Sequence, residues 1–506
     1  MALAYSYFVG TKDENESKND ESTVFAQGFH RCDYIIMTLQ VHNTLSGQVE
    51  EFVPLDPGVV KMYHCGPTVY GKQHIGNLSM FVFTDILRRT LEYTGYSVKQ
   101  VINFTDFGHL TSDGDEGEDK MTKGLKREGL EPTLKNMLAM GKKYGEVFKD
   151  DLKRLNIETT GTLFPSASEY VPQQIELIKR LEEKGFAYPG EDGIYFDTAQ
   201  FPEYGKLGKI NLRSMDQDFA RVKTIKGKRN HIDFALWKFN KELGWLSPWG
   251  KGFPGWHIEC SAMIIDILGP QIDIHTGGVE HIPVHHNNEI AQSEAATGLS
   301  PFSRFWLHRA HLQIGGEKIA KSEGNTVFLS EIIEKGFSPI AFRYFLLNST
   351  YHTATNFTWE GLEAANNAYK KLKEFMSSPF VSVGGMNNLG SFQVHSEYKK
   401  AFTKALENDL NTPEALAIVW NLVKDETVDT GLKRSTLRDF DVVLGLDLAH
   451  RDIEIEIPPH IVELARLRQI AKESKKYDEA DKIREEIEKQ GYQIRDADST
   501  FVIFAP

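Results

Sequence analysis

Residues 59–106 decide the fold, and they read VVKMYHCGPTVYGKQHIGNLSMFVFTDILRRTLEYTGYSVKQVINFTD. The opening apolar run predicts a buried strand, which a Gly-Pro-Thr turn ends at Gly66. A helical run then starts after Gly76 and closes at Gly95, and YSVKQVINFTD predicts a second strand. A strand, a helix and a strand of these lengths predict a β-α-β unit in a parallel sheet.

Other parts of the chain extend this sheet or interrupt it. QIDIHTGG (271–278) and FWLHRAHLQI (305–314) predict further strands. Mixed helical and strand patterns between 119 and 229 predict an inserted lobe, and the strongly helical sequence after Trp359 predicts an antiparallel bundle. We therefore predict an α/β fold, in which a Rossmann-type parallel-sheet domain with an inserted lobe precedes an α-helical bundle and a small C-terminal domain. The predicted boundaries are 1–36 for an extension, 37–118 and 230–304 for the two halves of the sheet domain, 119–229 for the lobe, 305–359 for a linker, 360–455 for the bundle and 456–506 for the C-terminal domain.

Composition excludes several classes of protein. The chain has 506 residues, with 58 Lys+Arg against 71 Asp+Glu and a formal net charge of −13. No apolar run approaches the roughly 18–20 residues that cross a bilayer, so a membrane protein is excluded. Three cysteines, Cys32, Cys65 and Cys260, cannot form a disulfide framework and favour a cytoplasmic protein. The acidic balance does not exclude RNA, because binding needs only a local basic surface.

The first 36 residues differ in composition from the rest of the chain. Residues 11–23 are almost wholly polar and charged. Such a segment cannot bury enough apolar area to order itself, so residues 1–36 are expected to form a disordered extension. Met37 then opens a stretch with strand-like alternation and is a candidate start, while the role of the extension stays open.

Two short motifs indicate a phosphate ligand. His74-Ile75-Gly76-Asn77 stands where the first strand gives way to its helix, and helix starts at that edge of a parallel sheet attract phosphate. Lys318-Ile319-Ala320-Lys321-Ser322 places two lysines in a glycine-flanked loop, where they can clamp a polyphosphate. Taken singly, the first is more typical of an ordinary helix start and the second of a solvated basic turn. Together and in this order, HIGN and KIAKS resemble the two ATP signatures of class I aminoacyl-tRNA synthetases, usually written HIGH and KMSKS.

A second group of residues has the chemistry of a zinc site. Cys65 lies just before the HIGN loop, Cys260 lies in GWHIECSAM, and His285 and Glu289 are four apart in PVHHNNEIAQSEA. On a helix, residues four apart share one face. Two thiolates, an imidazole and a carboxylate form an acceptable zinc set, although without a CxxC pair the spacing also suits small buried cysteines. From spacing alone, the adjacent His286 is an equally good ligand.

A longer series of motifs resembles the cysteinyl-tRNA synthetase family. These are MYHCGPTVYGKQHIGN, FPEYGKLGKINL, DFALWK, SPWGKGFPGWHIECSAM, VHHNNEIAQSEAATG, KIAKSEGN and ENDLNTPEAL. The resemblance runs from about Met37 to the C-terminus. It implies a cysteine–tRNA ligase, an enzyme that activates L-cysteine with ATP and Mg²⁺ and transfers it to the 3′ end of tRNA(Cys). It also implies a monomer, no membrane partner, and anticodon binding by the C-terminal domain.

The same resemblance implies roles for individual residues. The family's zinc ligands, for one Zn²⁺ per chain, match Cys65, Cys260, His285 and Glu289, which selects His285 over His286. Its cysteine pocket matches Thr105 and Trp256. Its ATP-binding residues match His74, Gly76, Asn77, Gly277, Gly278, Glu280, Lys318, Lys321 and Ser322, of which His74, Asn77, Lys318 and Lys321 would be catalytic. Zinc would select cysteine over serine, because it binds a thiolate and lowers the pKa of a thiol.

Some features depart from the family or allow another interpretation. KIAKS has Ile and Ala where the family has Met and Ser. The segment that contains residues 111–121 is longer and more acidic than in many members, and it is either a solvated loop, which we favour, or an additional cation-binding feature. The tail has many basic residues, but interspersed acidic residues also suit a helix with i,i+4 ion pairs. Two alternative functions are a zinc-dependent cysteine:glucosaminyl-inositol ligase and a non-catalytic tRNA-binding paralogue. The basic tail argues against the first, and retention of the zinc set, His74 and both lysines argues against the second.

Overall fold

The computed structural model describes residues 38–108, 119–210, 228–318, 326–377, 393–448, 458–497 and 500–504. The predictions for the extension 1–36 and for the acidic segment as far as residue 118 lie outside these ranges. Among the described residues, no helix combines the length and the apolar character that a membrane span needs.

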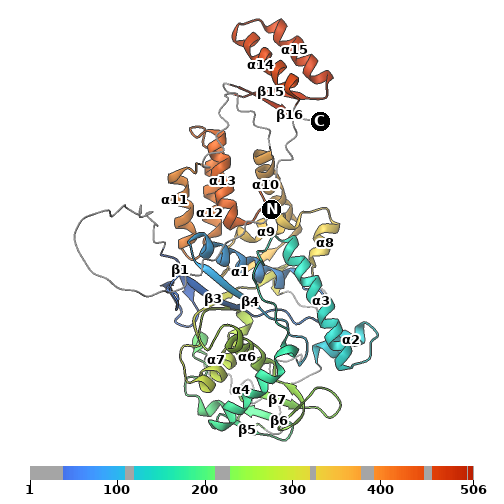
Figure 1. Ribbon diagram of the computed structural model, residues 1–506, viewed down its shortest axis with the longest axis vertical. Helices are drawn as coiled ribbons and strands as arrows, with labels where there is room; N and C mark the ends of the chain where they lie inside the picture. The colour runs from blue at the N-terminus through green and yellow to red at the C-terminus, as the bar shows by residue number, and fades with distance from the viewer. Residues whose placement is uncertain are drawn as a thin grey trace, which may run out of the picture. The chain divides into compact units, whose positions relative to one another are not determined.

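A four-stranded parallel sheet forms the centre of the sheet domain (Figure 1). Its strands are β3 (Val59–His64), β4 (Ser97–Ile102), β10 (Ile272–Gly278) and β11 (Ser303–Arg309), in the order β11-β10-β3-β4. Helix α1 (Ile75–Tyr93) joins β3 to β4, and α7 (His285–Thr297) joins β10 to β11. The chain therefore moves outward in opposite directions from β3 and β10. In open α/β sheets, ligands bind beyond the carboxyl ends of the strands at such a reversal.

Helix α1 is buried along most of its length. It begins after His74, whose Nδ1 accepts a hydrogen bond from the backbone N–H of Asn77 (3.2 Å). Leu78, Phe81 and Ile86 are among its buried residues and belong to one apolar core with strand β3 and the later helices. Burial of most of its residues, the charged Asp85 and Arg88 included, suits a helix packed between two layers. The β-α-β unit predicted over residues 59–106 is thus confirmed.

The region between β4 and β10 contains its own sheet. Helices α2 (Lys120–Arg127), α3 (Leu134–Arg154) and α4 (Val171–Glu183) precede a five-stranded sheet of order β5-β6-β7-β9-β8. Its antiparallel strands are β5 (Ala187–Pro189), β6 (Gly193–Phe196), β7 (Phe234–Phe239), β8 (Trp245–Ser247) and β9 (Gly250–Pro254). Helix α6 (Trp256–Ile267) then leads back to β10. The sheet extends past residue 229, where the inserted lobe is predicted to end. The apolar sequence of β7 is compatible with the parallel sheet and with the sheet of the lobe. Its pairing with β6 shows that β7 belongs to the sheet of the lobe.

After β11 the chain becomes mainly helical, and two helices already precede Trp359, after which the sequence predicted the helical region. The helices are α8 (Leu329–Glu334), α9 (Pro339–Leu347), α10 (Trp359–Ser377), α11 (Ser396–Glu407), α12 (Thr412–Lys424) and α13 (Thr430–Leu444). A small sheet of order β13-β12-β14 accompanies them, with strands β12 (Leu312–Ile314), β13 (Glu317–Lys318) and β14 (Thr355–Phe357). The prediction of one strand over 305–314 is wrong. The backbone N–H of Ala310 donates to the carbonyl oxygen of Tyr351 (2.9 Å), so the chain leaves the parallel sheet and β12 pairs with β14.

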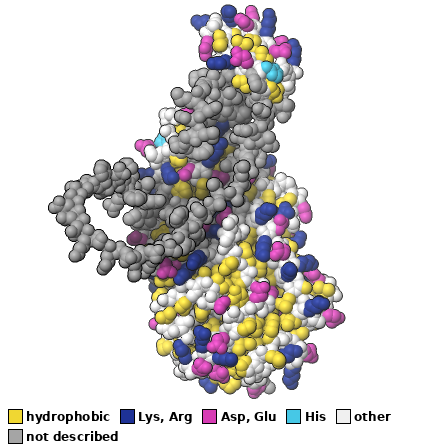
Figure 2. All heavy atoms as spheres, in the orientation of Figure 1, with side chains coloured by type: hydrophobic (Ala, Val, Ile, Leu, Met, Phe, Trp, Pro, Cys, Tyr) yellow, Lys and Arg dark blue, Asp and Glu magenta, His cyan; other side chains and the backbone are white. Residues whose placement is uncertain are grey.

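Two further elements complete the described chain. A hairpin of β1 (Gln40–Asn43) and β2 (Gln48–Glu51) precedes the parallel sheet. At the other end, α14 (Pro459–Glu473) and α15 (Tyr477–Lys489) pack through residues such as Ile461 and Ile487. They are followed by β15 (Gln493–Ala497) and β16 (Thr500–Phe504), a hairpin that the sequence did not predict. Figure 2 shows Lys/Arg and Asp/Glu side chains intermingled on this unit, consistent with i,i+4 pairs such as Arg484–Glu488 (3.1 Å).

A buried charge cluster fastens α1 to the helical region. The carboxylate of Asp85 on α1 forms ion pairs with Arg343 of α9 (2.5 Å) and with Arg89 (2.8 Å), and the Asp85 and Arg343 side chains have no solvent exposure. Arg343 also donates hydrogen bonds to the carbonyl oxygens of Leu155, which follows α3, and of Leu444, at the end of α13. Segments far apart in the sequence therefore meet at one guanidinium group.

Removing the Asp85 carboxylate should destabilise the protein strongly. Asp85→Ala leaves the Arg343 guanidinium buried without its counter-ion, so we expect a loss of about 3–5 kcal/mol in the free energy of unfolding, measured by urea titration. The control is Asp150→Ala, which breaks an exposed pair with Arg154 (2.6 Å; side chains 55% and 49% exposed) and should cost less than about 1 kcal/mol. Equal losses in the two variants would contradict a special role for the buried pair.

Candidate active site

The candidate site begins where strand β3 ends. Cys65 follows directly after β3, and its backbone N–H donates to the carbonyl oxygen of Thr276 in β10 (3.2 Å). The next residue, Gly66, donates its N–H to Oδ1 of Asn103 (2.8 Å). A Cβ at position 66 would lie only 1.6 Å from the carbonyl oxygen of Asn103. Only glycine therefore allows the chain to turn here and to hold Cys65 over the reversal point of the sheet.

The predicted metal-ligating residues come together at this point. One donor atom each of Cys65, Cys260, His285 and Glu289 lies within 4.8 Å of the other three. Cys260 comes from α6, whereas His285 and Glu289 lie one turn apart on α7. Nε2 of His285 is 3.0 Å from Oε1 of Glu289 and 3.8 Å from Sγ of Cys260, and Sγ of Cys65 is 3.7 Å from that same carboxylate oxygen.

This arrangement fits a tetrahedral metal ion. Zn–S and Zn–N bonds of about 2.3 and 2.0 Å imply donor atoms roughly 3.5 Å apart, close to the separations found here. All four residues are buried. Burial alone would raise the pKa of the Cys260 thiol, but hydrogen bonds with Cys65 and His285 bring that pKa down to about 6. Burial also acts to raise the pKa of the Glu289 carboxyl, yet the neighbouring His275 and His285 hold it well below its usual range. The Cys260 thiol and the Glu289 carboxyl therefore favour their deprotonated, metal-binding forms. Burial raises the pKa of the Cys65 thiol. Burial acts to lower the pKa of His285, but the Glu289 carboxylate raises it to about 10, so metal binding would release protons from Cys65 and His285.

Further histidines hold these ligands in place. Nε2 of His275 hydrogen-bonds to Oε2 of Glu289 (2.9 Å), and Nδ1 of His257 to Nδ1 of His285 (2.8 Å). Ligands of catalytic metals generally have such outer partners, which fix their orientation. Spacing did not identify His257 and His275, because each lies within a run that reads simply as a helix or a strand.

His286, the alternative ligand, also lies next to the cluster. Its Nε2 is 3.3 Å from Sγ of Cys65, and Cys65, His275, His286 and Glu289 form a second four-residue group of suitable geometry. Both groups use Cys65 and Glu289. The other nitrogen of His286 hydrogen-bonds to Nε2 of His308 (2.7 Å). Geometry alone therefore leaves both imidazoles as candidates.

The residues predicted for the cysteine pocket adjoin the metal cluster. Trp256 opens α6, and its ring centroid lies 4.1 Å from that of His285. Nζ of Lys120 lies 5.8 Å from the Trp256 ring centroid. The hydroxyl of Thr105, just after β4, donates to the carboxylate of Glu259, the neighbour of Cys260 (2.9 Å). Neither Lys120 nor Glu259 carried a signal in the sequence.

The chain just after the second phosphate motif meets the first motif at the start of α1. The backbone N–H of Ile75 donates to the carbonyl oxygen of Val327 (2.9 Å), and His74 forms an antiparallel bridge with Phe328. Residues 327–328 follow KIAKS closely, so one end of that loop is anchored beside HIGN, which contains Gly76 and Asn77. The other end is anchored because Lys318 pairs with Gln313 between β13 and β12. Lys321 and Ser322 lie outside the described residues.

The residues predicted to cradle adenosine lie at the carboxyl end of β10. Gly277 and Gly278 close the strand, and Glu280 follows in a short 3₁₀ turn. A Cβ at position 277 would lie 2.6 Å from the His286 ring, so a larger residue would displace that imidazole. The Glu280 carboxylate is 3.4 Å from Nδ1 of His311. These residues therefore share the reversal point with the metal cluster.

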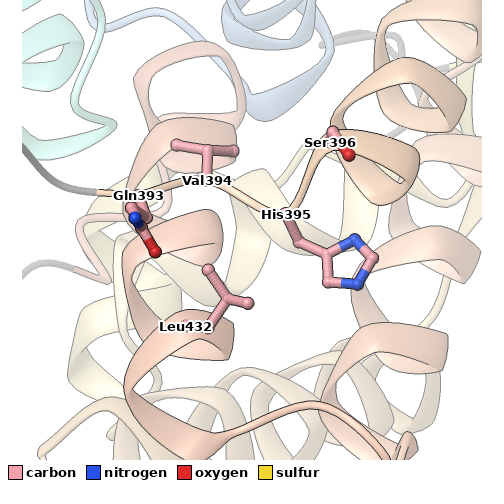
Figure 3. Close-up of a pocket in the computed structure, with 5 residues that line it drawn as sticks. All are labelled: Gln393, Val394, His395, Ser396 and Leu432. Atoms are coloured by element: carbon pink, nitrogen blue, oxygen red, sulfur yellow. The ribbon is translucent and has the colours of Figure 1, made fainter.

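A pocket of about 360 Å³ in the helical region is not part of this site. It is lined by Gln393, Val394, His395, Ser396 and Leu432 (Figure 3). Nδ1 of His395 accepts the backbone N–H of Tyr398 (3.5 Å) and so caps α11. The lining therefore offers a helix cap rather than converging reactive groups.

Comparison with known proteins identifies the class of the fold. The family model described as "tRNA synthetases class I (C) catalytic domain" matches residues 51–367, and the DALR domain model matches residues 401–449. A methionyl-tRNA synthetase structure from Mycobacterium tuberculosis, bound by methionyl-adenylate, has the same fold, with a TM-score of 0.51 and 14% identity over 76% of this chain and 90% of that one. The fold and the family match define the class, which is class I tRNA synthetase.

Relatives at higher identity narrow the class to one family. Cysteine–tRNA ligase 1 of Burkholderia lata is 41% identical over 91% of this chain and 95% of its own length. Cysteine–tRNA ligase of Treponema denticola is also 41% identical, over 91% of this chain and 98% of its own. The chain belongs to the cysteine–tRNA ligase family, as the motifs predicted.

Loss of a histidine that holds a ligand should weaken metal binding. His275→Ala removes the hydrogen-bond partner of Glu289, so we expect zinc affinity to fall about 10–100-fold in competition with a chromophoric chelator. His311→Ala is the control, because His311 also faces a carboxylate, that of Glu280, but outside the cluster. Unchanged affinity in His275→Ala would show that Glu289 does not need this partner.

Proposed function

We propose that this chain joins L-cysteine to the 3′ end of tRNA(Cys) in two ATP-dependent steps. The cysteine carboxylate attacks the α-phosphate of ATP and releases pyrophosphate, which gives cysteinyl-adenylate. A ribose hydroxyl of the tRNA then attacks the activated carbonyl and releases AMP. The observation that carries this proposal is the buried Cys65, Cys260, His285 and Glu289 cluster, which adjoins the HIGN helix start at the reversal of a parallel sheet.

We propose Zn²⁺, one ion per chain, as the metal held by these four residues. When bound, the ion would accept the substrate thiolate as a ligand, a bond that the hard hydroxyl of serine cannot match. The chain's part is to keep the donors buried and at fixed separations. A site that requires a specific polar contact with its substrate can reject an analogue that lacks the contacting group by a factor of about 10⁴ or more.

The phosphate-binding roles rest on the two motifs. We propose that His74 and Asn77 stabilise charge that develops on the phosphates, and that Lys318 and Lys321 neutralise the departing pyrophosphate. Gly76 and Ser322 would line the same phosphates. We assign adenosine to Gly277, Gly278 and Glu280, with the Glu280 carboxylate as the ribose contact, and Mg²⁺ to the phosphates of ATP.

The remaining assignments stay predictions at the level of whole segments. The linker that carries KIAKS is proposed to contact the acceptor stem, the helical bundle to bind tRNA, and residues 456–506 to bind the anticodon. The basic residues that motivate the last role are Arg466, Arg468, Lys472, Lys475, Lys476, Lys482 and Arg484. A cytoplasmic location and a monomeric state also stay predictions.

Pyrophosphate exchange tests the proposed activation step. With purified protein, we expect exchange of labelled pyrophosphate into ATP that depends on cysteine and not on serine, in samples with about one zinc per chain. Transfer of cysteine to tRNA(Cys) rather than to glucosaminyl-inositol would then identify the acceptor. Zinc-loaded protein without any exchange would overturn the enzymatic proposal in favour of a tRNA-binding protein.

The second lysine of KIAKS should act on the phosphates alone. Lys321→Ala removes a positive charge from the proposed pyrophosphate site, so adenylate formation should slow at least tenfold while the Kd for cysteine stays within about twofold. Single-turnover kinetics and calorimetry measure the two quantities. Lys335→Ala, at the end of α8, serves as the charge-matched control and should leave both quantities unchanged. A parallel loss of cysteine affinity in Lys321→Ala would indicate misfolding instead.

A further inference from the structure

Glu259 is a buried carboxylate whose position is not explained by stability. Its side chain has no solvent exposure, and one oxygen, Oε2, accepts a hydrogen bond from the hydroxyl of Thr105 (2.9 Å). The other oxygen, Oε1, is buried and has no hydrogen-bond partner among the described residues. An unpaired buried acceptor weakens a fold. A residue retained at such a cost needs another explanation.

The bond to Glu259 fixes what the Thr105 hydroxyl can do. A threonine hydroxyl has one hydrogen and two lone pairs. The hydrogen is given to Glu259, and Nδ2 of Asn103 approaches the same oxygen from another side (3.5 Å). The backbone of Thr105 is itself held, because its N–H donates to Pro67 (3.2 Å) and its carbonyl accepts from Val69 (3.0 Å). Thr105 therefore presents an oxygen that can only accept a further hydrogen bond.

The hydroxyl oxygen of Thr105 lies near the cluster of Cys65, Cys260, His285 and Glu289. Glu259 immediately precedes the proposed ligand Cys260, and Asn103 spans the gap, with Oδ1 4.0 Å from Sγ of Cys260 and Nδ2 3.5 Å from the Thr105 oxygen. In a bound cysteine, only Cα and Cβ separate the sulfur from the nitrogen. With the sulfur at the cluster and the carboxylate directed to the phosphate, the α-ammonium is the remaining charged group, and it needs acceptors.

We propose that Glu259 is a positioning residue that makes Thr105 an acceptor for the α-ammonium of the substrate cysteine. The proposal rests on the proposed function, because it takes cysteine as the substrate. It assigns to Glu259 an indirect role, since it acts by taking the hydroxyl hydrogen of Thr105. A carboxamide can take the same hydrogen through its carbonyl oxygen, whereas an aliphatic side chain of similar size cannot.

The test compares ligands with and without an ammonium group. Calorimetry would give the Kd of cysteine and of 3-mercaptopropionate, which keeps the thiol and the carboxylate, for the full chain loaded with zinc. The ratio of the two constants cancels any change that acts through the thiol site, including altered metal occupancy. For Glu259→Leu we expect the Kd of cysteine divided by the Kd of 3-mercaptopropionate to rise about tenfold or more. For Glu259→Gln we expect the same ratio to stay within about threefold of that of the parent chain.

Two further variants separate positioning from general damage. Thr105→Val should shift the ratio like Glu259→Leu, and the double variant should shift it no further than Thr105→Val alone, because both act on one contact. Asp106→Leu is the matched control: Asp106 is a neighbouring buried carboxylate, but its hydroxyl partner is Ser168 (2.6 Å), so the ratio should not change.

The outcomes distinguish this inference from the proposed function. An unchanged ratio in Glu259→Leu, additive shifts in the double variant, or an equal shift in Asp106→Leu would each overturn the positioning role. Failure of the parent chain to bind cysteine in preference to serine would instead overturn the proposed function. A shift of the Kd ratio in Glu259→Leu and Thr105→Val that is not additive in the double variant and is absent in Glu259→Gln would support the positioning role of Glu259 and the proposed function.

Discussion

The carboxylate of Glu289 is the constraint on which the site depends. It is fully buried on α7, and a buried charge is tolerated only when it is paired or coordinated. Its two oxygens face different partners, with His285 near Oε1 (3.0 Å) and His275 near Oε2 (2.9 Å). Sγ of Cys65, which follows β3, also lies 3.7 Å from Oε1, so this single group draws together β3, β10 and α7. The strand order of the sheet and the geometry of the site therefore depend on each other.

The sequence predicted features that depend on local pattern. The β-α-β unit of residues 59–106 followed from apolar runs and turn residues. Helical spacing placed Glu289 on one face with either His285 or His286, and only the family resemblance selected His285. Contacts between distant segments were not predictable in this way. Asn103 and Glu259 each place a side chain beside the metal cluster, near Cys260 and Thr105, and no spacing in the sequence singled out either residue. The pairing of β7 with β6 was not predictable either, because an apolar pattern indicates a buried strand but not the sheet to which that strand belongs.

The helical region is connected to the site through α1. That helix carries His74 at its start and Asp85 in its middle, where Arg343 and Arg89 neutralise the carboxylate. Arg343 in turn binds the carbonyl oxygen at the end of α13. A displacement of α13 would thus have to break the buried hydrogen bond from Arg343 to the carbonyl oxygen of Leu444, or carry Arg343 and its Asp85 partner with it. Breaking that bond would leave part of a buried guanidinium unpaired, so we expect the two regions to move together.

The departures in KIAKS can be judged from how its loop is anchored. On one side β13 pairs with β12, and on the other residues 327–328 pair with residues 74–75. These contacts join backbone groups, which every residue except proline provides alike. Replacing Met and Ser by Ile319 and Ala320 therefore leaves both anchors available, and both lysines remain in the sequence. The substitutions leave unchanged Lys318 and Lys321, the two lysines to which we assign the charge at the phosphates.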